Sequence, residues 1–216
     1  MGRNHTFAPG EWYHCYNRGV EKLKTFLKDH DFRRFLLQLY CSNSRTPYPN
    51  LTYRAESLAD VIQRGARDPE SLVNVGAYCL MPNHFHLLVQ ERIEGGIARF
   101  MQKLITGYTM YFNKRYQRTG PLFSGVFKSR HVADDRYLQH VVSYIHLNPL
   151  DLPTISPRSI YSYPFSSLLD FTRNAKRIER AILSDVIFDC TDQGERVSEM
   201  MKSSALYADA ATTMLK

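Results

Sequence analysis

The sequence predicts an α+β fold built around a four-stranded antiparallel sheet, and the order of its apolar runs carries this prediction. Short runs rich in apolar and aromatic residues, bounded by turn residues, predict strands at residues 11–18, 73–81, 84–90 and 123–132. Apolar residues at helical spacing predict the main helices at residues 29–41, 96–117 and 134–148. The first six elements follow the ferredoxin-like βαββαβ pattern, whose helices lie on one face of the sheet. The helix at 134–148 is an addition to that pattern.

Residue types at the helix ends set the boundaries of the first and last helices. Asp29 or Asp31 can cap the first helix, because a short acidic side chain accepts hydrogen bonds from free backbone N–H groups. Asp134 or Asp135 can do the same for the last helix. Pro149 then stops that helix, because proline has no N–H to continue the hydrogen-bond ladder.

Length and composition predict one folded core with two appended parts. The chain has 216 residues, of which 44% are hydrophobic, and this is enough for a sizeable core. The segment at residues 42–72, with a short helix at about 56–64, is longer than an ordinary connection, so we interpret it as an insertion on the surface. We expect a main domain at 1–170 and a helical C-terminal extension at 171–216.

Charge and cysteine usage narrow the class of protein. The net charge of +7 and the pI near 9.2 indicate a polyanionic partner, most simply nucleic acid. The four cysteines form no CxxC pair, which argues against a zinc ribbon or a redox motif. No apolar run reaches the roughly 18 residues that a membrane span needs, and residues 1–10 lack the apolar core of a signal peptide. We therefore expect a cytoplasmic protein with no membrane partner.

Two histidines one residue apart lie inside an apolar run, MPNHFHLLVQ at 81–90. Side chains alternate between the two faces of a strand, so His84 and His86 would share one face. Phe85 and Leu87 would point to the opposite face and enter the core. Such a pair of imidazoles can be half of a metal site, or only a pair of histidines at the surface or in the core.

The last predicted helix offers the other half. Asn148 follows Tyr144 by four residues, so the two lie about 40° apart on the flank of the helix's buried stripe. His146 falls about 160° from Tyr144 and should face elsewhere. A helix packed on the histidine face of the sheet would present Tyr144 and Asn148 to the two imidazoles.

Together these side chains have a chemical use. Two neutral imidazoles and one amide oxygen suit Mg²⁺ or Mn²⁺ when a phosphate supplies further oxygens. The metal would polarise a scissile phosphate and stabilise charge on the departing 3′ oxygen. Tyr144 would attack phosphorus as a phenolate and form a covalent phosphotyrosine. Because the ordinary pKa of tyrosine is near 10, the metal or a base must help it to ionise.

Five stretches of the chain resemble, in order, the motifs of the HUH single-tyrosine transposases, and most closely the REP-associated tyrosine transposase branch. They are YHCYNRG at 13–19, AYCLMPNHFHLLV at 77–89, YFNKRYQRTGPLF at 111–123, YIHLNPL at 144–150 and YPFSSL at 163–168. The resemblance covers roughly residues 11–170. It implies a ferredoxin-like catalytic domain that cuts and joins single-stranded DNA near imperfect hairpins. By this resemblance His84 and His86 are metal ligands, Tyr144 is the nucleophile and Asn148 is the third ligand.

Basic residues interleaved with aromatic ones predict a surface for single-stranded DNA, because bases stack on rings while cations follow the phosphates. The candidates are Arg18, Lys114, Arg115, Lys128 and Arg130. The same residues can instead form a solvated face, which is the usual fate of a run of charges.

Two other functions remain open at this stage. A ferredoxin-like sheet with basic and aromatic residues can bind RNA or single-stranded DNA without chemistry. A metal-dependent nuclease would use water and leave Tyr144 structural. Replication initiators and relaxases usually add a third histidine or a second tyrosine to the cluster, and the sequence shows neither pattern. The sequence is compatible with a monomer or a homodimer.

Overall fold

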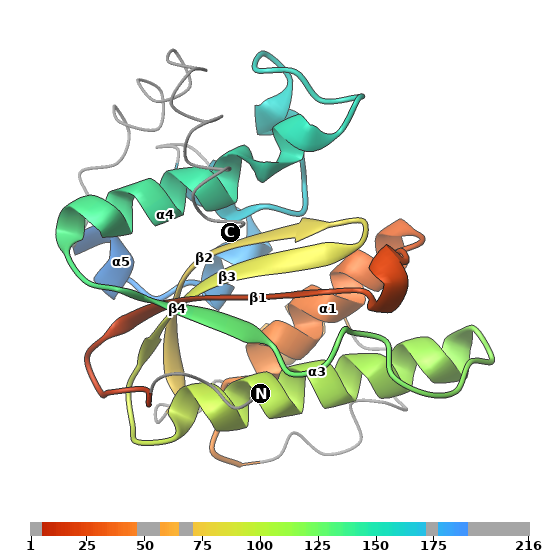
Figure 1. Ribbon diagram of the computed structural model, residues 1–216, viewed down its shortest axis with the longest axis horizontal. Coiled ribbons are helices and arrows are strands. Elements are labelled where there is room, and N and C mark those ends of the chain that lie inside the picture. The colour runs from red at the N-terminus through yellow and green to blue at the C-terminus, as the bar shows by residue number, and fades with distance from the viewer. Residues whose placement is uncertain (1–5, 47–56, 65–70, 172–176, 190–216) are drawn as a thin grey trace.

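The computed structural model describes residues 6–46, 57–64, 71–171 and 177–189 and contains one four-stranded antiparallel sheet (Figure 1). Its strands are β1 (Trp12–Arg18), β2 (Val73–Met81), β3 (His84–Glu91) and β4 (Lys128–Val132). Their order across the sheet is β2-β3-β1-β4, with β1 and β3 in the centre. This order places β3 between the two strands that α1 connects, which is the ferredoxin-like arrangement that the sequence predicts.

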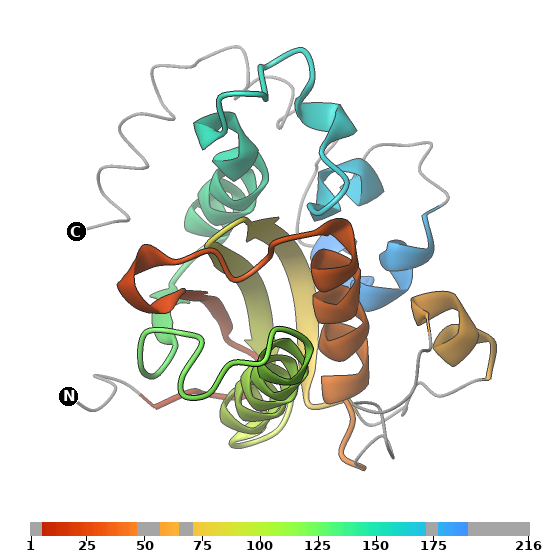
Figure 2. The same cartoon turned by 90° about the vertical axis from the view of Figure 1, so that its right-hand side faces the viewer.

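Helices cover both faces of the sheet. α1 (Asp29–Ser42) and α3 (Gly96–Arg115) lie side by side on one face, whereas α4 (Asp135–Leu147) crosses the other (Figure 1). Figure 2, turned by 90°, shows the same two-sided arrangement. The prediction of two helices on one face with a further, tyrosine-bearing helix is therefore confirmed.

The core between the sheet and the helix pair α1 and α3 is aromatic. Phe35 of α1 lies 5.0 Å, between ring centroids, from both Phe85 of β3 and Tyr108 of α3. All three side chains are fully buried. The buried residues of α3 follow the helical spacing that the sequence predicts. This packing fixes β3, and with it the alternate residues that face α4.

Two boundaries of the main elements differ from the sequence prediction by two or more residues, and the cap of α1 differs from the predicted one. β4 begins at Lys128 rather than at 123, because Gly125 has a φ of +68°, which interrupts an extended strand. α3 ends at Arg115 rather than at 117, and Gln117 has a φ of +51°. The N-cap of α1 is Lys28, while Asp31 accepts hydrogen bonds from the backbone N–H groups of residues 27 and 28. Asp134 caps α4 as predicted, because its carboxylate accepts a hydrogen bond from the N–H of residue 137.

The two appended parts are described only in pieces. Of the insertion predicted at 42–72, α2 (Leu58–Gln63) lies at the predicted short helix, while residues 47–56 and 65–70 lie outside the described residues. Of the extension, a 3₁₀ helix (Ile178–Ile182) and α5 (Val186–Asp189) pack on the main core. Residues 190–216 lie outside the described part. No helix in the residues that the structure describes has the length and hydropathy to cross a membrane.

The segment at 163–168 ties α4 to the outer strand of the sheet. The Ser167 hydroxyl accepts a hydrogen bond from the N–H of Tyr78 on β2, at 2.9 Å. The same oxygen lies 2.8 Å from Nε2 of His146 on α4. His146 therefore faces the protein interior, away from the histidines of the sheet, as its angle on the helix predicts. This contact fixes the rotation of α4 and so the direction of Tyr144.

Gly19 closes β1 in a place where a side chain does not fit. Its N–H donates to the carbonyl of Asn83 at 2.8 Å, and an added Cβ would lie 2.1 Å from the carbonyl oxygen of Leu23. We expect Gly19→Ala to lower the free energy of unfolding by about 1–3 kcal/mol in urea denaturation. Gly107→Ala is the control, because its methyl would meet the end of the flexible Gln38 side chain. Equal losses in the two variants would contradict the backbone clash.

Candidate active site

His84 and His86 lie together on the face of the sheet that α4 covers. Their ring centroids are 5.0 Å apart, and the neighbouring strand β1 places Arg18 opposite His84 and Tyr16 opposite His86. His86 is buried, while His84 is half-buried. The shared face predicted from their spacing is present.

Tyr144 reaches this pair from α4. Its ring centroid lies 5.4 Å from that of His86, in an edge-to-face arrangement. Val141 and Ile145, on either side of it along the helix, are completely buried and hold α4 against the sheet. Only 5% of the Tyr144 side chain is exposed. The helix flank predicted for Tyr144 therefore faces the histidines.

Asn148 connects the tyrosine with the first histidine. Its side-chain nitrogen donates to the backbone carbonyl of Tyr144 at 2.8 Å, at the end of α4. Against the larger effect of burial, the nearby Asn148 side chain raises the pKa of His84 and lowers that of Tyr144. Asn148 is thus a helix-end residue and a member of the cluster at once.

The His84 ring has a defined tautomer. Its Nδ1 lies 2.7 Å from Oδ1 of Asn83, and the Asn83 amide nitrogen donates to the Lys22 carbonyl at 3.3 Å. The Asn83 oxygen can only accept a hydrogen bond, so Nδ1 of His84 carries the proton. The lone pair of Nε2 is left for another partner.

A third histidine, which the sequence analysis did not identify, completes the cluster. Nε2 of His14 on β1 lies 2.9 Å from Nδ1 of His86. The ring of Tyr16, two residues along β1, lies 5.7 Å from that of His86. His14 and Tyr16 therefore lie beside the predicted histidine pair, which no pattern in the sequence had indicated by itself. The alternation of His14, Tyr16 and Arg18 along one strand was the available signal, but its use required knowing that β1 pairs with β3.

Burial sets the protonation of the cluster. Desolvation lowers the pKa of His84 to about 4 and that of His14 to about 3, and it holds the pKa of His86 well below its ordinary value. All three rings are neutral at pH 7. Burial raises the pKa of Tyr144 above its ordinary value, and the nearby Asn148 side chain opposes this rise. At neutral pH the resting tyrosine is a phenol.

The buried neutral histidines predict acid sensitivity. Burial also lowers the pKa of His146 to about 3, so four histidines titrate near 6.5 when unfolded but far lower when folded. Between pH 6.5 and about 4 the unfolded chain binds more protons than the folded one, so stability falls as pH falls. We expect a loss of about 1.4 kcal/mol per pH unit for each such histidine, without added metal. Urea unfolding at pH 7.5, 6 and 5 measures it, and equal stability at pH 7.5 and 5 would contradict it.

The predicted DNA-contacting cations separate into two groups. Arg18, Lys128 and Arg130 lie on the histidine face, since Lys128 is opposite Tyr16 and Arg130 is opposite His14. Lys114 and Arg115 are exposed at the C-terminal end of α3, which covers the other face. The structure therefore brings three of the five to the cluster.

The nitrogen and oxygen atoms of the cluster that could bind a metal are few, so they suit a metal ion that takes most of its ligands from water or substrate. Within the described ranges, no group of three or more His, Cys, Asp or Glu side chains is arranged to hold a metal ion. His84 and His86 supply at most two imidazole nitrogens, and the Asn148 amide oxygen can be a third donor. Further ligands would have to come from water or from a phosphate, as is common for Mg²⁺.

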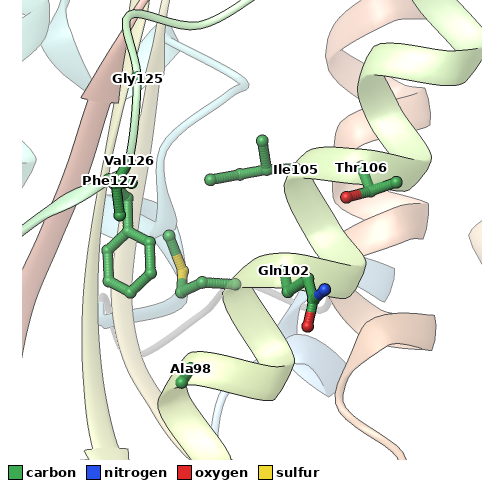
Figure 3. Close-up of a pocket in the computed structure, with 8 residues that line it drawn as sticks. Ala98, Gln102, Ile105, Thr106, Gly125, Val126 and Phe127 are labelled. Atoms are coloured by element: carbon green, nitrogen blue, oxygen red, sulfur yellow. The ribbon is translucent and has the colours of Figure 1, made fainter.

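A cavity of about 350 Å³ lies on the other side of the sheet, between α3 and the segment that precedes β4 (Figure 3). Its walls are mainly apolar, from residues such as Met101, Ile105 and Phe127. None of the cluster residues lines it, so it is separate from the candidate site.

Comparison with known proteins assigns the chain to a family. Residues 39–148, just over half of the chain, match the family described as transposase IS200-like. The chain belongs to the IS200-like transposase family. The matched span contains His84, His86 and Tyr144 and ends at Asn148, whereas His14 lies outside it.

A solved structure supports the same fold. It is a REP-associated tyrosine transposase bound to a REP hairpin, with a TM-score of 0.50 and 15% sequence identity. The similarity covers 83% of this chain and 89% of that one. The comparison with curated proteins gave no match.

Proposed function

We propose that this member of the IS200-like family cuts and rejoins single-stranded DNA, with Tyr144 as the nucleophile. The observation that carries the proposal is the edge-to-face contact of Tyr144 with His86, which in turn lies against His84. A protein that only binds nucleic acid has no need for a buried tyrosine beside two neutral histidines. The five motifs of the HUH single-tyrosine transposases in this chain support the same reaction.

The reaction exchanges one phosphoester bond for another. The Tyr144 hydroxyl releases its proton to solvent that enters with the DNA, and its oxygen attacks the scissile phosphorus, which forms the bond between oxygen and phosphorus. The bond from phosphorus to the 3′ oxygen breaks, and that oxygen takes up a proton. The 5′ phosphate stays on Tyr144. A 3′ hydroxyl of another strand then attacks the same phosphorus, rejoins the DNA and releases the tyrosine, so no external energy source is required.

His84 and His86, through their Nε2 atoms, and the Asn148 amide oxygen would hold Mg²⁺ or Mn²⁺. When bound, such a metal withdraws charge from the scissile phosphate and from the departing oxygen. The protein contributes neutral imidazoles that need not lose a proton first, because burial keeps the pKa of each far below 7. It also keeps Tyr144 shielded from water, so the covering side chains must shift before DNA reaches the hydroxyl.

Arg18, Lys128 and Arg130 would guide the DNA backbone to the cluster. Arg18 is exposed beside the half-buried His84, and this edge is the open side of the site. Lys114 and Arg115, on the other face, would contact DNA outside the reacting segment. The solved relative was bound to a REP hairpin, and we propose hairpin-containing single strands as substrates of this chain as well.

The test is a covalent-adduct assay. The protein is incubated with labelled single-stranded hairpin DNA from the flanks of its own gene, with Mg²⁺ or Mn²⁺, and is run on a denaturing gel. We expect a metal-dependent band of reduced mobility that protease removes. Cleavage without such a band would indicate a nuclease that uses water. Binding without cleavage across a set of hairpins would favour a non-catalytic binding module.

Asn148→Ala tests the third donor. We expect the Mn²⁺ concentration for half-maximal cleavage to rise about tenfold, because the substitution removes the amide oxygen that is the proposed third metal ligand and the side chain that lies beside His84. Cleavage should recover at high Mn²⁺. Asn148→Asp is the companion variant, since a carboxylate keeps an oxygen donor and should retain metal dependence near that of the wild type. An unchanged Mn²⁺ dependence in Asn148→Ala would reduce Asn148 to a helix-end residue.

A further inference from the structure

His14 is a buried polar residue that the proposed reaction does not use. It belongs to the YHCYNRG stretch on β1, and only 3% of its side chain is exposed. Its Nε2 lies 2.9 Å from Nδ1 of His86, and the two rings are nearly parallel, with centroids 5.1 Å apart. The contact joins two central strands, because β1 pairs with β3 along its whole length.

The two histidines proposed as ligands use their rings in the same way. Nδ1 of His84 bonds to the Asn83 side chain, and Nδ1 of His86 bonds to His14. In each ring this contact uses Nδ1 and leaves Nε2 for another partner. A neutral imidazole carries one proton, so Nε2 can bind a metal only when that proton sits on Nδ1.

We propose that His14 accepts a hydrogen bond from Nδ1–H of His86 and thereby holds Nε2 of His86 as the metal-binding atom. The inference rests on the proposed metal-dependent function. It makes His14 a positioning residue, in the way that partners of metal-bound histidines fix the tautomer and orientation of the ring. Loss of such a partner typically weakens metal affinity by about 10- to 100-fold.

The geometry separates this role from that of a third ligand. The nitrogen of His14 that faces the cluster, Nε2, already lies at hydrogen-bond distance from His86. The absence of a three-residue His, Cys, Asp and Glu metal group among the described residues agrees with this. Asn83 has the corresponding position beside His84, so the site contains one hydrogen-bond partner for each proposed ligand.

The first measurement reads the tautomer directly in the metal-free protein. Long-range ¹H–¹⁵N NMR of histidine rings reports which nitrogen carries the proton. We expect His86 in the wild type to be protonated on Nδ1 and bare on Nε2. A His86 ring protonated on Nε2 would overturn the proposal, whatever the effect of any variant.

The second measurement compares Mn²⁺ affinity, by electron paramagnetic resonance without DNA, in three variants. His14→Gln keeps an acceptor near the position of Nε2, whereas His14→Phe keeps the shape and loses the acceptor. We expect Mn²⁺ affinity to fall at least tenfold in His14→Phe and to stay within about threefold in His14→Gln. The control His131→Phe removes an exposed histidine on the other face and should leave affinity unchanged.

The outcomes distinguish the inference from the function on which it rests. Equal Mn²⁺ affinity in the wild type and His14→Phe would overturn the role of His14 while leaving the metal site in place. A wild type whose bound Mn²⁺ is unaffected by His84→Ala and His86→Ala would overturn both. Thermal unfolding of each variant identifies a loss caused by misfolding, and the tautomer of the wild type then decides the question alone.

Discussion

Tyr144→Phe is expected to abolish the covalent adduct and to reduce DNA cleavage at least about 1,000-fold, because no other atom at that position can form the phosphoester. Binding of hairpin DNA should remain within about threefold of the wild type. The ring, its packing on His86 and the buried face of α4 are unchanged by the substitution. A gel that resolves the adduct and an equilibrium binding assay measure the two quantities.

The matched control is Tyr16→Phe. Tyr16 lies on the same face of the sheet and also contacts His86, but it comes from β1 and is half-buried. We expect this variant to retain the adduct. An adduct that persists in Tyr144→Phe and disappears in Tyr16→Phe would transfer the nucleophile to β1.

The second large effect is expected from removal of either proposed metal ligand. His84→Ala and His86→Ala should each lower cleavage at a fixed Mg²⁺ concentration at least about 100-fold, because charge stabilisation by the metal is worth several kcal/mol. Rising Mn²⁺ concentration should restore part of the activity. The metal dependence of initial cleavage rates measures this loss.

His131→Ala serves as the comparison for a histidine outside the cluster. It lies on β4, is exposed, and its Nε2 is 2.7 Å from Glu11. Its cleavage rate and metal dependence should match those of the wild type. Undiminished cleavage in both His84→Ala and His86→Ala would remove the metal site from the proposal.

Local patterns in the sequence predicted the parts of the fold that depend on periodicity. Alternation placed His84 and His86 on one face, and the helical angle separated Tyr144 from His146. Both inferences hold in the structure, because the strand and the helix are regular at these points and each packs through one apolar side. The order of elements along the chain also predicted the ferredoxin-like class of the fold.

Features that depend on contacts between distant segments or on single backbone angles could not be predicted from the sequence. His14 joins the cluster only because β1 pairs with β3 in one register, and no local pattern reports that register. The predicted start of β4 is too early, because no local pattern reports the left-handed φ of Gly125. Lys114 and Lys128 are close in the chain, but Lys114 lies on α3, which covers one face of the sheet, whereas the register of β4 places Lys128 on the opposite, histidine-bearing face.

The central claim is that Tyr144 carries the DNA. Its most direct test is to digest the adduct with nuclease and trypsin and to locate the attached nucleotide by tandem mass spectrometry. Trypsin releases Tyr144 in the peptide 137–158, whose fragment ions separate it from Tyr137. We expect a nucleotide joined through its 5′ phosphate to Tyr144. A nucleotide attached to Tyr16, Tyr137 or any other residue instead would contradict the assignment of Tyr144 as the nucleophile.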